Sequence, residues 1–323
     1  MQLRDRIGRR MKLQDLNVLM TVVQAGSMGK AAQRLNTSQP NVSRSIADLE
    51  HALGVRLLDR HRKGVEPTRC GRALLDGGAA VFDELRQAVK NIEFLADPAA
   101  GEVRVGSIPP LAASFVSVVI DRLARRYPRI VFDCLTALTE ALHRELHERN
   151  VDLLIARRFG ALADARLDFQ FLFDDSYVVA AGMQNPWARR RRIALADLVG
   201  ESWLLPPPES VPGAVLRDAM RAAGLAYPRA SVLTNSAEVR MNLLAGSRFL
   251  TIFATSTLRF STQRPEIKVL PVELPGARVP VGIITLKNRT LDPVARLFID
   301  TAVEVAKPRA EGKGSSRASA GPR

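Results

Sequence analysis

Cysteine and histidine are scarce in this chain, and their scarcity excludes several kinds of site. Among 323 residues there are 2 cysteines and 4 histidines. Cys70 and Cys134 are far apart in the sequence, so they provide neither a disulfide framework nor metal-ligand spacing. His143 and His147 have the i, i+4 spacing of a zinc motif, but Arg144 stands where that motif has glutamate, which favours an ordinary surface helix. We therefore expect no metal and no other cofactor.

Long apolar runs are also missing. No stretch approaches the roughly eighteen apolar residues that a membrane-spanning helix needs. The basic segment 1–10 is not followed by the apolar core of an export signal. We expect a cytoplasmic protein that does not bind membranes. Because the patterned sequence begins near Met11, translation from Met1 and from Met11 are both compatible with it.

Acidic residues are outnumbered by basic ones. The chain has 47 Lys and Arg against 33 Asp and Glu, a formal net charge of +14. This balance favours a polyanionic partner, with nucleic acid first, although a basic soluble enzyme would show it too. The length suits two or three domains.

Residues 12–67 are predicted to form three short helices followed by a hairpin. Leu16, Leu19 and Val23 recur on one face of the first helix, which ends at Gly26. The second helix follows Ser27, and the third follows a turn at residues 36–38. Its predicted buried stripe consists of Val42, Ile46, Leu49 and Leu53.

The opposite face of the third helix carries short hydrogen-bonding side chains and one arginine at its N-terminal end. A recognition helix reads base edges in the major groove with residues placed there, whereas a solvated face is the alternative. Residues 55–67 resemble a basic wing whose cations would contact phosphates. The predicted DNA-binding residues are Lys30, Ser38, Gln39, Pro40, Asn41, Ser43, Arg44, Arg60, Arg62, Lys63 and Thr68.

This region resembles the signature of LysR-type transcriptional regulators. The resemblance lies in residues 27–35 and 38–46, then in Leu49-Glu50, Leu53-Gly54 and the end of the wing, about sixty residues without a gap. Leu58, Pro67 and Cys70 depart from the residues usual in the family. The resemblance implies a dimer that reads a short interrupted palindrome on double-stranded DNA, often as a tetramer across two sites.

Residues 68–97 are predicted to form one long linker helix. Apolar residues recur along it at alternating spacings of three and four, a period typical of a coiled-coil seam. Such a helix pairs with a second copy or packs on its own wing domain, and one helix can do both. Gly77 and Gly78 suggest a close helix crossing. The predicted dimerisation residues are Leu75, Phe82, Leu85, Val89 and Ile92.

Residues 101–306 alternate strand and helix patterns, which indicates parallel βαβ units. This segment resembles the periplasmic-binding-protein-like effector domain of the same family. The fold class is thus α/β with an N-terminal winged helix-turn-helix and a C-terminal two-lobed effector domain. Lobe I is expected at about 101–176 and 281–306, and lobe II at about 177–280, joined by crossover strands near 174–180 and 277–283. Residues 307–323 are expected to be a disordered basic tail.

A ligand of an open α/β sheet binds at the C-terminal ends of the strands. Helix N-termini there would offer N–H groups to a carboxylate or phosphate. The ligand is a small molecule, with a carboxylate, a sugar acid and an aromatic acid all left open. The predicted effector-binding residues are Ser107, Ile108, Pro109, Thr136, Thr139, Arg157, Trp203, Asn235 and Ser236.

Together these features predict a sequence-specific regulator that activates or represses promoters in response to an effector. It would act as a homodimer or homotetramer, with RNA polymerase as a further candidate partner. The alternatives are a non-specific architectural DNA-binding protein and an α/β enzyme. We expect no enzyme, because the chain has no nucleophile elbow, no phosphate-binding loop and no metal motif.

Overall fold

The computed structural model describes residues 11–61, 64–158, 164–246, 248–260 and 265–307. It divides the chain into two compact units, Met1–Lys90 and Asn91–Arg323. The predicted tail beyond residue 307, like Arg62 and Lys63 of the wing, lies outside the described residues.

The first unit begins with the three predicted helices, α2 (Leu13–Ala25), α3 (Met28–Arg34) and α4 (Gln39–Leu53). Gly26 and Gly54 end α2 and α4 with φ of 68° and 72°, a left-handed conformation that costs glycine little. Ser27 and Ser38 cap α3 and α4 by accepting from the backbone N–H three residues ahead. Their apolar faces form one core with Leu19, Val22, Ala31, Val42, Ile46 and Leu49.

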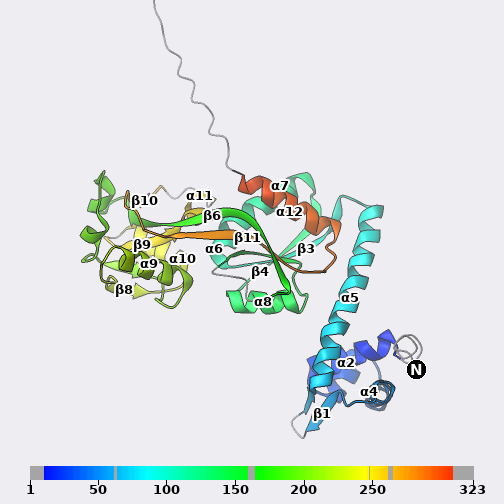
Figure 1. Ribbon diagram of the computed structural model, residues 1–323. Coiled ribbons are helices and arrows are strands. Elements are labelled where there is room, and N and C mark those ends of the chain that lie inside the picture. The colour runs from blue at the N-terminus through cyan, green and yellow to red at the C-terminus, as the bar shows by residue number, and fades with distance from the viewer. Residues whose placement is uncertain (1–10, 62–63, 159–163, 247, 261–264, 308–323) are drawn as a thin grey trace, which may run out of the picture. The chain divides into compact units, whose positions relative to one another are not determined.

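The hairpin follows as β1 (Leu58–His61) and β2 (Gly64–Pro67), which pair antiparallel. Leu57 and Leu58 bury their side chains in the core of the three helices, so the hairpin extends from that core as a wing. The predicted winged helix-turn-helix is therefore confirmed (Figure 1).

The long helix α5 (Arg69–Ala96) has 28 residues. Gly78 is buried against the side chain of Leu16, and a Cβ at Gly78 would lie 2.9 Å from one Leu16 methyl carbon. The close crossing predicted for the glycine pair thus exists at Gly78, where α5 meets α2, whereas Gly77 has open space around it. This crossing fixes the start of α5 on the core of the winged domain.

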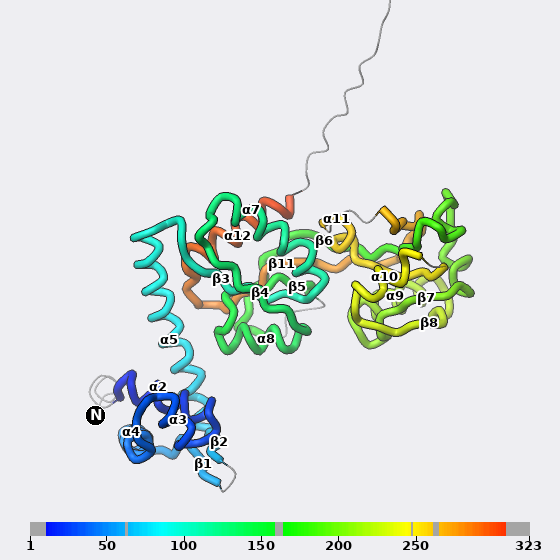
Figure 2. Tube along the Cα trace, turned by 180° about the vertical axis from the view of Figure 1, so that it is seen from behind, coloured from blue at the N-terminus to red at the C-terminus, as the bar shows by residue number. Residues whose placement is uncertain are grey.

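The second unit contains a mixed sheet in the order β4-β3-β5-β11-β6-β9-β7-β8, with β10 paired to β6. Figure 2 shows the path of the chain through this unit from behind. β3 (Ala100–Ser107) is parallel to β4 (Arg129–Thr136) and β5 (Leu153–Arg157), as the alternating pattern predicts. The long strands β6 (Leu167–Gly182) and β11 (Arg278–Leu286) run antiparallel to each other. Beyond them come β9 (Leu250–Ala254), β7 (Trp203–Leu205), β8 (Ala230–Leu233) and the short β10 (Ile267–Val269).

Separate hydrophobic cores define two lobes in this unit. Lobe I is built around Phe115, Val281 and Phe298, and lobe II around Trp203 and Ile252. β6 and β11 contribute to both cores, because each strand passes from one lobe into the other. The two-lobed α/β architecture predicted from the sequence is confirmed (Figure 1).

Helices cover both faces of the sheet in each lobe. In lobe I, α7 (Ser117–Arg126) and α12 (Pro293–Ala306) pack together on one face, and α8 (Thr139–His147) covers the other. In lobe II, alternate residues of β9 point to opposite faces: Ile252 meets the core of α9 (Val211–Ala222), and Phe253 that of α10 (Ala237–Ala245). The 3-10 turns Pro186–Arg189 and Leu195–Leu198 complete lobe II, whereas the short α11 (Thr255–Arg259) follows β9 and packs against lobe I.

The helical segment that follows β3 is not uniform. It begins as α6 (Pro109–Leu111) and passes through a π-helical turn at Ala112–Val116 before α7. The hydroxyl of Ser114 donates to the Pro110 carbonyl at 2.6 Å, and that of Ser117 to the Ala113 and Ser114 carbonyls at 3.0 and 2.8 Å. Hydroxyl side chains thus satisfy carbonyls at this irregular turn.

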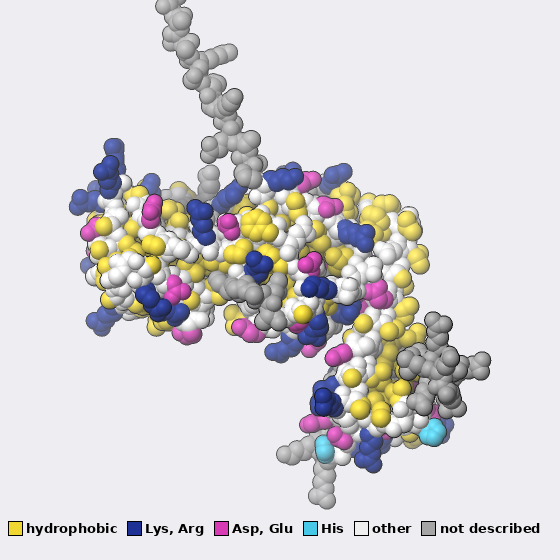
Figure 3. Space-filling view, in the orientation of Figure 1, with side chains coloured by type: hydrophobic (Ala, Val, Ile, Leu, Met, Phe, Trp, Pro, Cys, Tyr) yellow, Lys and Arg dark blue, Asp and Glu magenta, His cyan; other side chains and the backbone are white. Residues whose placement is uncertain are grey.

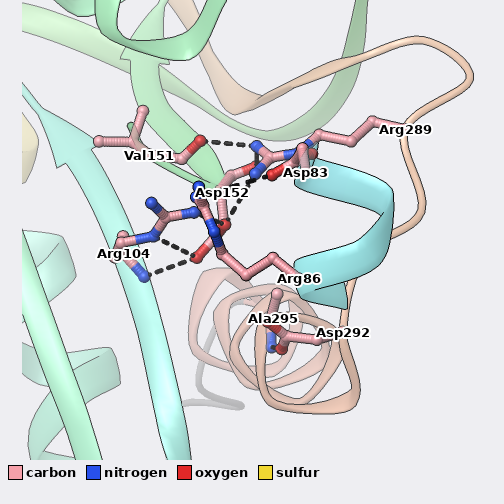
Figure 4. A network of polar contacts seen from close by, with 8 residues as sticks. All are labelled: Asp83, Arg86, Arg104, Val151, Asp152, Arg289, Asp292 and Ala295. Atoms are coloured by element: carbon pink, nitrogen blue, oxygen red, sulfur yellow. Dashed lines mark hydrogen bonds and ion pairs between the residues drawn. The ribbon is translucent and has the colours of Figure 1, made fainter. Parts of the chain in front are cut away.

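A buried ionic network fixes the base of lobe I (Figure 4). Asp152 accepts from the guanidinium groups of Arg104 and Arg289 at 2.7 and 3.0 Å. Arg289 also donates to the Val151 carbonyl at 2.6 Å. The two arginines compensate the charge of Asp152, since a fully buried carboxylate is stable only when it is paired and hydrogen-bonded.

Candidate functional site

The N-terminal end of α4 presents a polar face to solvent. Gln39, Asn41 and Arg44 are exposed, and Ser43 is half-buried beside them. Ser38 uses its hydroxyl to cap the helix at the Asn41 N–H, and the Asn41 side chain donates to Thr37 at 3.2 Å. The residues predicted to read bases therefore share one accessible helix end, with Pro40 in its first turn.

The wing lies next to this helix face. Arg60 of β1 donates to the Ser43 hydroxyl at 3.4 Å, so a predicted phosphate contact and a predicted base contact are neighbours. Lys30 is exposed on α3, and its neighbour Gly29 lies against the Gln39 side chain. These side chains together form a cationic and hydrogen-bonding surface of the kind that binds duplex DNA.

Sequence reasoning missed the residue that positions the wing. The Glu50 carboxylate accepts from the backbone N–H groups of Leu57 and Leu58 at 2.7 and 3.2 Å, which ties α4 to the start of β1. An acidic residue beside the apolar stripe of α4 was the available signal. Thr68, predicted as a DNA contact, donates to the Arg56 carbonyl and accepts from the Gly71 N–H, so its hydroxyl serves as the cap of α5.

The predicted seam of α5 divides into two parts. Leu75 packs against the core of the winged domain, where the close crossing at Gly78 brings this part of the helix onto α2, and its place in a dimer interface stays a prediction. Phe82 is half-buried. Leu85, Val89 and Ile92 are 47%, 54% and 66% exposed, and hydrophobic side chains follow this helix in Figure 3.

A cleft of about 570 Å³ lies between the two lobes of the second unit. Lobe I supplies Ile108, Pro109 and Pro110 from the segment that follows β3, and Thr139 from the start of α8. Lobe II supplies the N-terminal turns of α9 and α10 and the end of β9. Of the predicted effector-binding residues, the structure brings together Ile108, Pro109, Thr139, Arg157, Asn235 and Ser236.

Three predicted residues do not line the cleft, and their assignment is corrected. Ser107 is fully buried and donates to the Ile155 carbonyl at 2.8 Å, within the sheet. Trp203 is also fully buried in the core of lobe II, where its indole N–H donates to the Leu198 carbonyl at 2.8 Å. Thr136 ends the outermost strand β4 and is not among the lining residues, although Leu138, two residues later, is. Strand alternation decides the first two, because neighbouring strand residues face opposite sides.

Arg157 lines the cleft, but its guanidinium already has hydrogen-bond partners within the protein. Its guanidinium donates to Asp175 of β6 at 2.7 and 3.0 Å and to the Ser256 hydroxyl at 3.4 Å. Asp175 also accepts from the Ser256 backbone N–H at 2.9 Å. The ring of Tyr177 lies beneath the same guanidinium, 5.7 Å away. This buried cluster joins β5, the crossover strand β6 and the start of α11.

Arg240 is the cleft residue that sequence reasoning missed. It lies on α10, is 4% exposed and has its guanidinium 5.4 Å from the Phe253 ring centroid. Burial lowers the pKa of Arg240 to about 10, so the side chain is still charged at neutral pH. The available signal was a basic residue followed, three and four positions on, by Leu243 and Leu244.

Within the described part of the chain, no group of histidine, cysteine and acidic side chains is arranged to hold a metal ion. Among the same residues, no helix combines the length and apolar character needed to cross a bilayer. Lys and Arg side chains are interspersed with Asp and Glu on the face of the second unit visible in Figure 3.

Two family models match the chain. The model of the bacterial regulatory helix-turn-helix protein, lysR family, matches residues 13–72, and that of the LysR substrate binding domain matches residues 96–307. Among curated proteins, the chain is 26% identical over 288 residues to the HTH-type transcriptional regulator GbpR of Azospirillum brasilense, covering 89% of this chain and 84% of that protein. It is 27% identical to the transcriptional dual regulator GltC of Bacillus subtilis, over 91% of this chain and 97% of that protein.

Solved structures share the fold. A full-length OxyR variant from Pseudomonas aeruginosa has a TM-score of 0.66 at 22% identity, covering 90% of this chain and 94% of that one. Full-length CbnR complexed with its target DNA has a TM-score of 0.54 at 21% identity, covering 92% of this chain and 100% of that one. These relatives give no support to an architectural protein. The chain belongs to the LysR family and is a DNA-binding transcriptional regulator with an effector-binding domain.

Proposed function

We propose that a small molecule held in the cleft between lobes I and II controls how this regulator engages promoter DNA. The observation that carries the proposal is a cleft of about 570 Å³ lined by residues of both lobes. Its volume lies in the range of small-molecule sites, roughly 300–1,000 Å³. The strands β6 and β11 connect the two lobes. A ligand that contacts both lobes therefore stabilises the arrangement of the lobes to which it binds most tightly.

On the DNA side, Gln39, Asn41 and Arg44 would contact base edges in the major groove, and Arg60 would contact phosphate. Their exposure at one end of α4 and the proximity of Arg60 to Ser43 support these roles. A second copy, paired through the exposed stripe of α5, would supply the other half of a palindrome. RNA polymerase is the further partner we expect at such promoters.

The regulator would act in the cytoplasm, and we propose no enzymatic activity for it. Its response to ligand would be a shift between two DNA-bound arrangements. Such a shift requires that the ligand bind one arrangement more tightly than the other. Activation and repression are both compatible with this scheme.

The test begins with selection of bound duplexes from a random DNA library at two salt concentrations. An enriched interrupted palindrome is expected, whereas salt-sensitive retention without a motif would contradict sequence-specific reading. The selected duplex then serves in footprinting with a panel of organic acids, sugars and amino acids.

The cleft itself is tested with a matched pair of variants. Thr139→Trp places a large ring at an exposed position on the cleft rim, and Val131→Trp places the same ring at an exposed position near the other end of β4. We expect the first to abolish the change of footprint that an active compound causes, and the second to leave it intact. Equal responses from both variants would remove the cleft from the mechanism.

A further inference from the structure

Arg240 is a cation enclosed in the cleft without enough acceptors. Its Nε atom and one terminal nitrogen are buried and have no hydrogen-bond partner among the described residues. A guanidinium carries five N–H donors, and burying unsatisfied donors of a charged group is costly. Arg157, the other arginine of the lining, differs because Asp175 and Ser256 satisfy it. The cleft therefore has one arginine committed to the fold and one that lacks acceptors.

The surroundings of Arg240 offer little to compensate it. The Phe253 ring provides a cation–π contact, and the neighbouring Tyr177 is a neutral phenol, since burial raises its pKa above the usual range. Glu238 raises the pKa of Arg240 electrostatically, but this carboxylate is exposed and accepts instead from the Ser236 hydroxyl at 3.1 Å. Both nitrogens are closed off from solvent, so the guanidinium has to turn toward the cleft before an entering anion can supply the missing acceptors.

Side chains of the protein already cap or neutralise the helix N-termini that face the cleft. Glu140 and Glu238 stand in the first turns of α8 and α10, and Ser210 and Ser236 cap α9 and α10 through their hydroxyls. Acidic side chains in a first turn offset the positive end of the helix dipole. The helix N-termini therefore attract an anion less strongly than the sequence suggests, and Arg240 attracts a negative charge more strongly than they do.

The rest of the lining limits how much negative charge the ligand can carry. Glu140, Glu209 and Glu238 all line the cleft, so a second anionic group would meet like charges. The remaining lining is largely apolar and suits a hydrocarbon or aromatic body. Its apolar members include Ile108, Pro109, Leu138, Val211, Pro212 and Phe253.

We propose that the effector is a monocarboxylate with an apolar body, and that its carboxylate accepts hydrogen bonds from Arg240. This assignment rests on the proposed function of the cleft as the effector site. A preference for monocarboxylates distinguishes this site from one that would bind phosphates, dicarboxylates or neutral sugars. Arg157 keeps its partners and positions the crossover strand.

The experiment uses the full-length protein with benzoate, its neutral analogue benzamide and the dianion phthalate, each titrated by calorimetry. Benzoate is expected to bind, and both benzamide and phthalate are expected to bind at least roughly tenfold more weakly. Arg240→Met should weaken benzoate binding by about 10- to 100-fold, the loss expected for charge-assisted hydrogen bonds. Arg240→Lys, which keeps the charge, should retain part of it. Arg190→Met, at an exposed position of the same lobe, is the control.

Folding is checked by thermal unfolding of each variant. Arg240→Met removes an unsatisfied buried charge, so its Tm should equal or exceed that of the parent protein. The proposal is overturned if benzoate binds no better than benzamide, or if Arg240→Met binds benzoate as tightly as the Arg190→Met control. Footprinting with benzoate separates the two proposals. If benzoate binds through Arg240 but leaves the footprint unchanged, only the proposed function is contradicted. If neutral compounds change the footprint through the cleft, only the proposed ligand class is contradicted.

Discussion

The guanidinium of Arg157 donates twice to the carboxylate of Asp175, at 2.7 and 3.0 Å, at the level where β6 leaves lobe I for lobe II. The two side chains are 5% and 0% exposed. A buried ion pair of this kind contributes little net stability when intact, but removing one partner leaves an uncompensated charge.

Asp175→Ala should therefore lower the free energy of unfolding of the second unit by about 3–5 kcal/mol. Asp174→Ala, at the exposed neighbouring position, should change it by less than about 0.5 kcal/mol. Urea titration of the full-length variants, followed by circular dichroism, measures both. Similar midpoints for the two variants would show that the pair does not hold the crossover strand.

Two glycines of α5 should respond in opposite ways to the same change. A Cβ at Gly71 would overlap the Leu57 carbonyl oxygen, so Gly71→Ala should destabilise the winged domain by about 1–3 kcal/mol. Gly77 has open space and helical backbone, so Gly77→Ala should stabilise it by about 0.5–1 kcal/mol. Thermal unfolding of the two variants tests the contrast. A loss of stability at Gly77 would contradict the open surroundings.

Arg44 and Arg60 should contribute differently to DNA binding. Arg44→Ala should weaken the selected duplex by about 1–3 kcal/mol and relax base preference at one position of each half-site. Arg60→Ala should weaken all duplexes alike and reduce the slope of log K against log salt by about 1. Fluorescence anisotropy with matched and scrambled duplexes at several salt concentrations distinguishes them. Identical profiles would refute the division into reading and anchoring.

The exposed stripe of α5 predicts the oligomeric state. Leu85→Asp with Val89→Asp would place two carboxylates where a second copy is expected to bury apolar side chains, so dimer affinity should fall at least about a hundredfold. Ala73→Asp adds the same charge at an exposed position of the same helix and should leave the assembly intact. Sedimentation velocity measures the masses. A dimer that survives the double substitution would exclude this stripe as the interface.

The order of helices and strands was predictable because local signals specify it. Ser27, Ser38 and the two glycines after α2 and α4 mark helix ends by backbone chemistry that depends only on near neighbours. The alternation of strands and helices after residue 100 likewise follows from hydrophobic periodicity. Exposed polar residues at the start of α4 were recognisable for the same reason: their spacing alone assigns them to one helix face.

What the sequence could not determine is which side chains meet across long separations. Ser107 and Trp203 stand at strand positions that suit a cleft, yet strand register turns both into the interior. Arg157 is satisfied by Asp175 and Ser256, whereas Arg240 lacks acceptors, and no local pattern distinguishes two arginines in this way. Local propensity therefore determined the elements of this regulator. The packing of distant strands and helices decided which of its buried charged groups have hydrogen-bond partners and which lack acceptors.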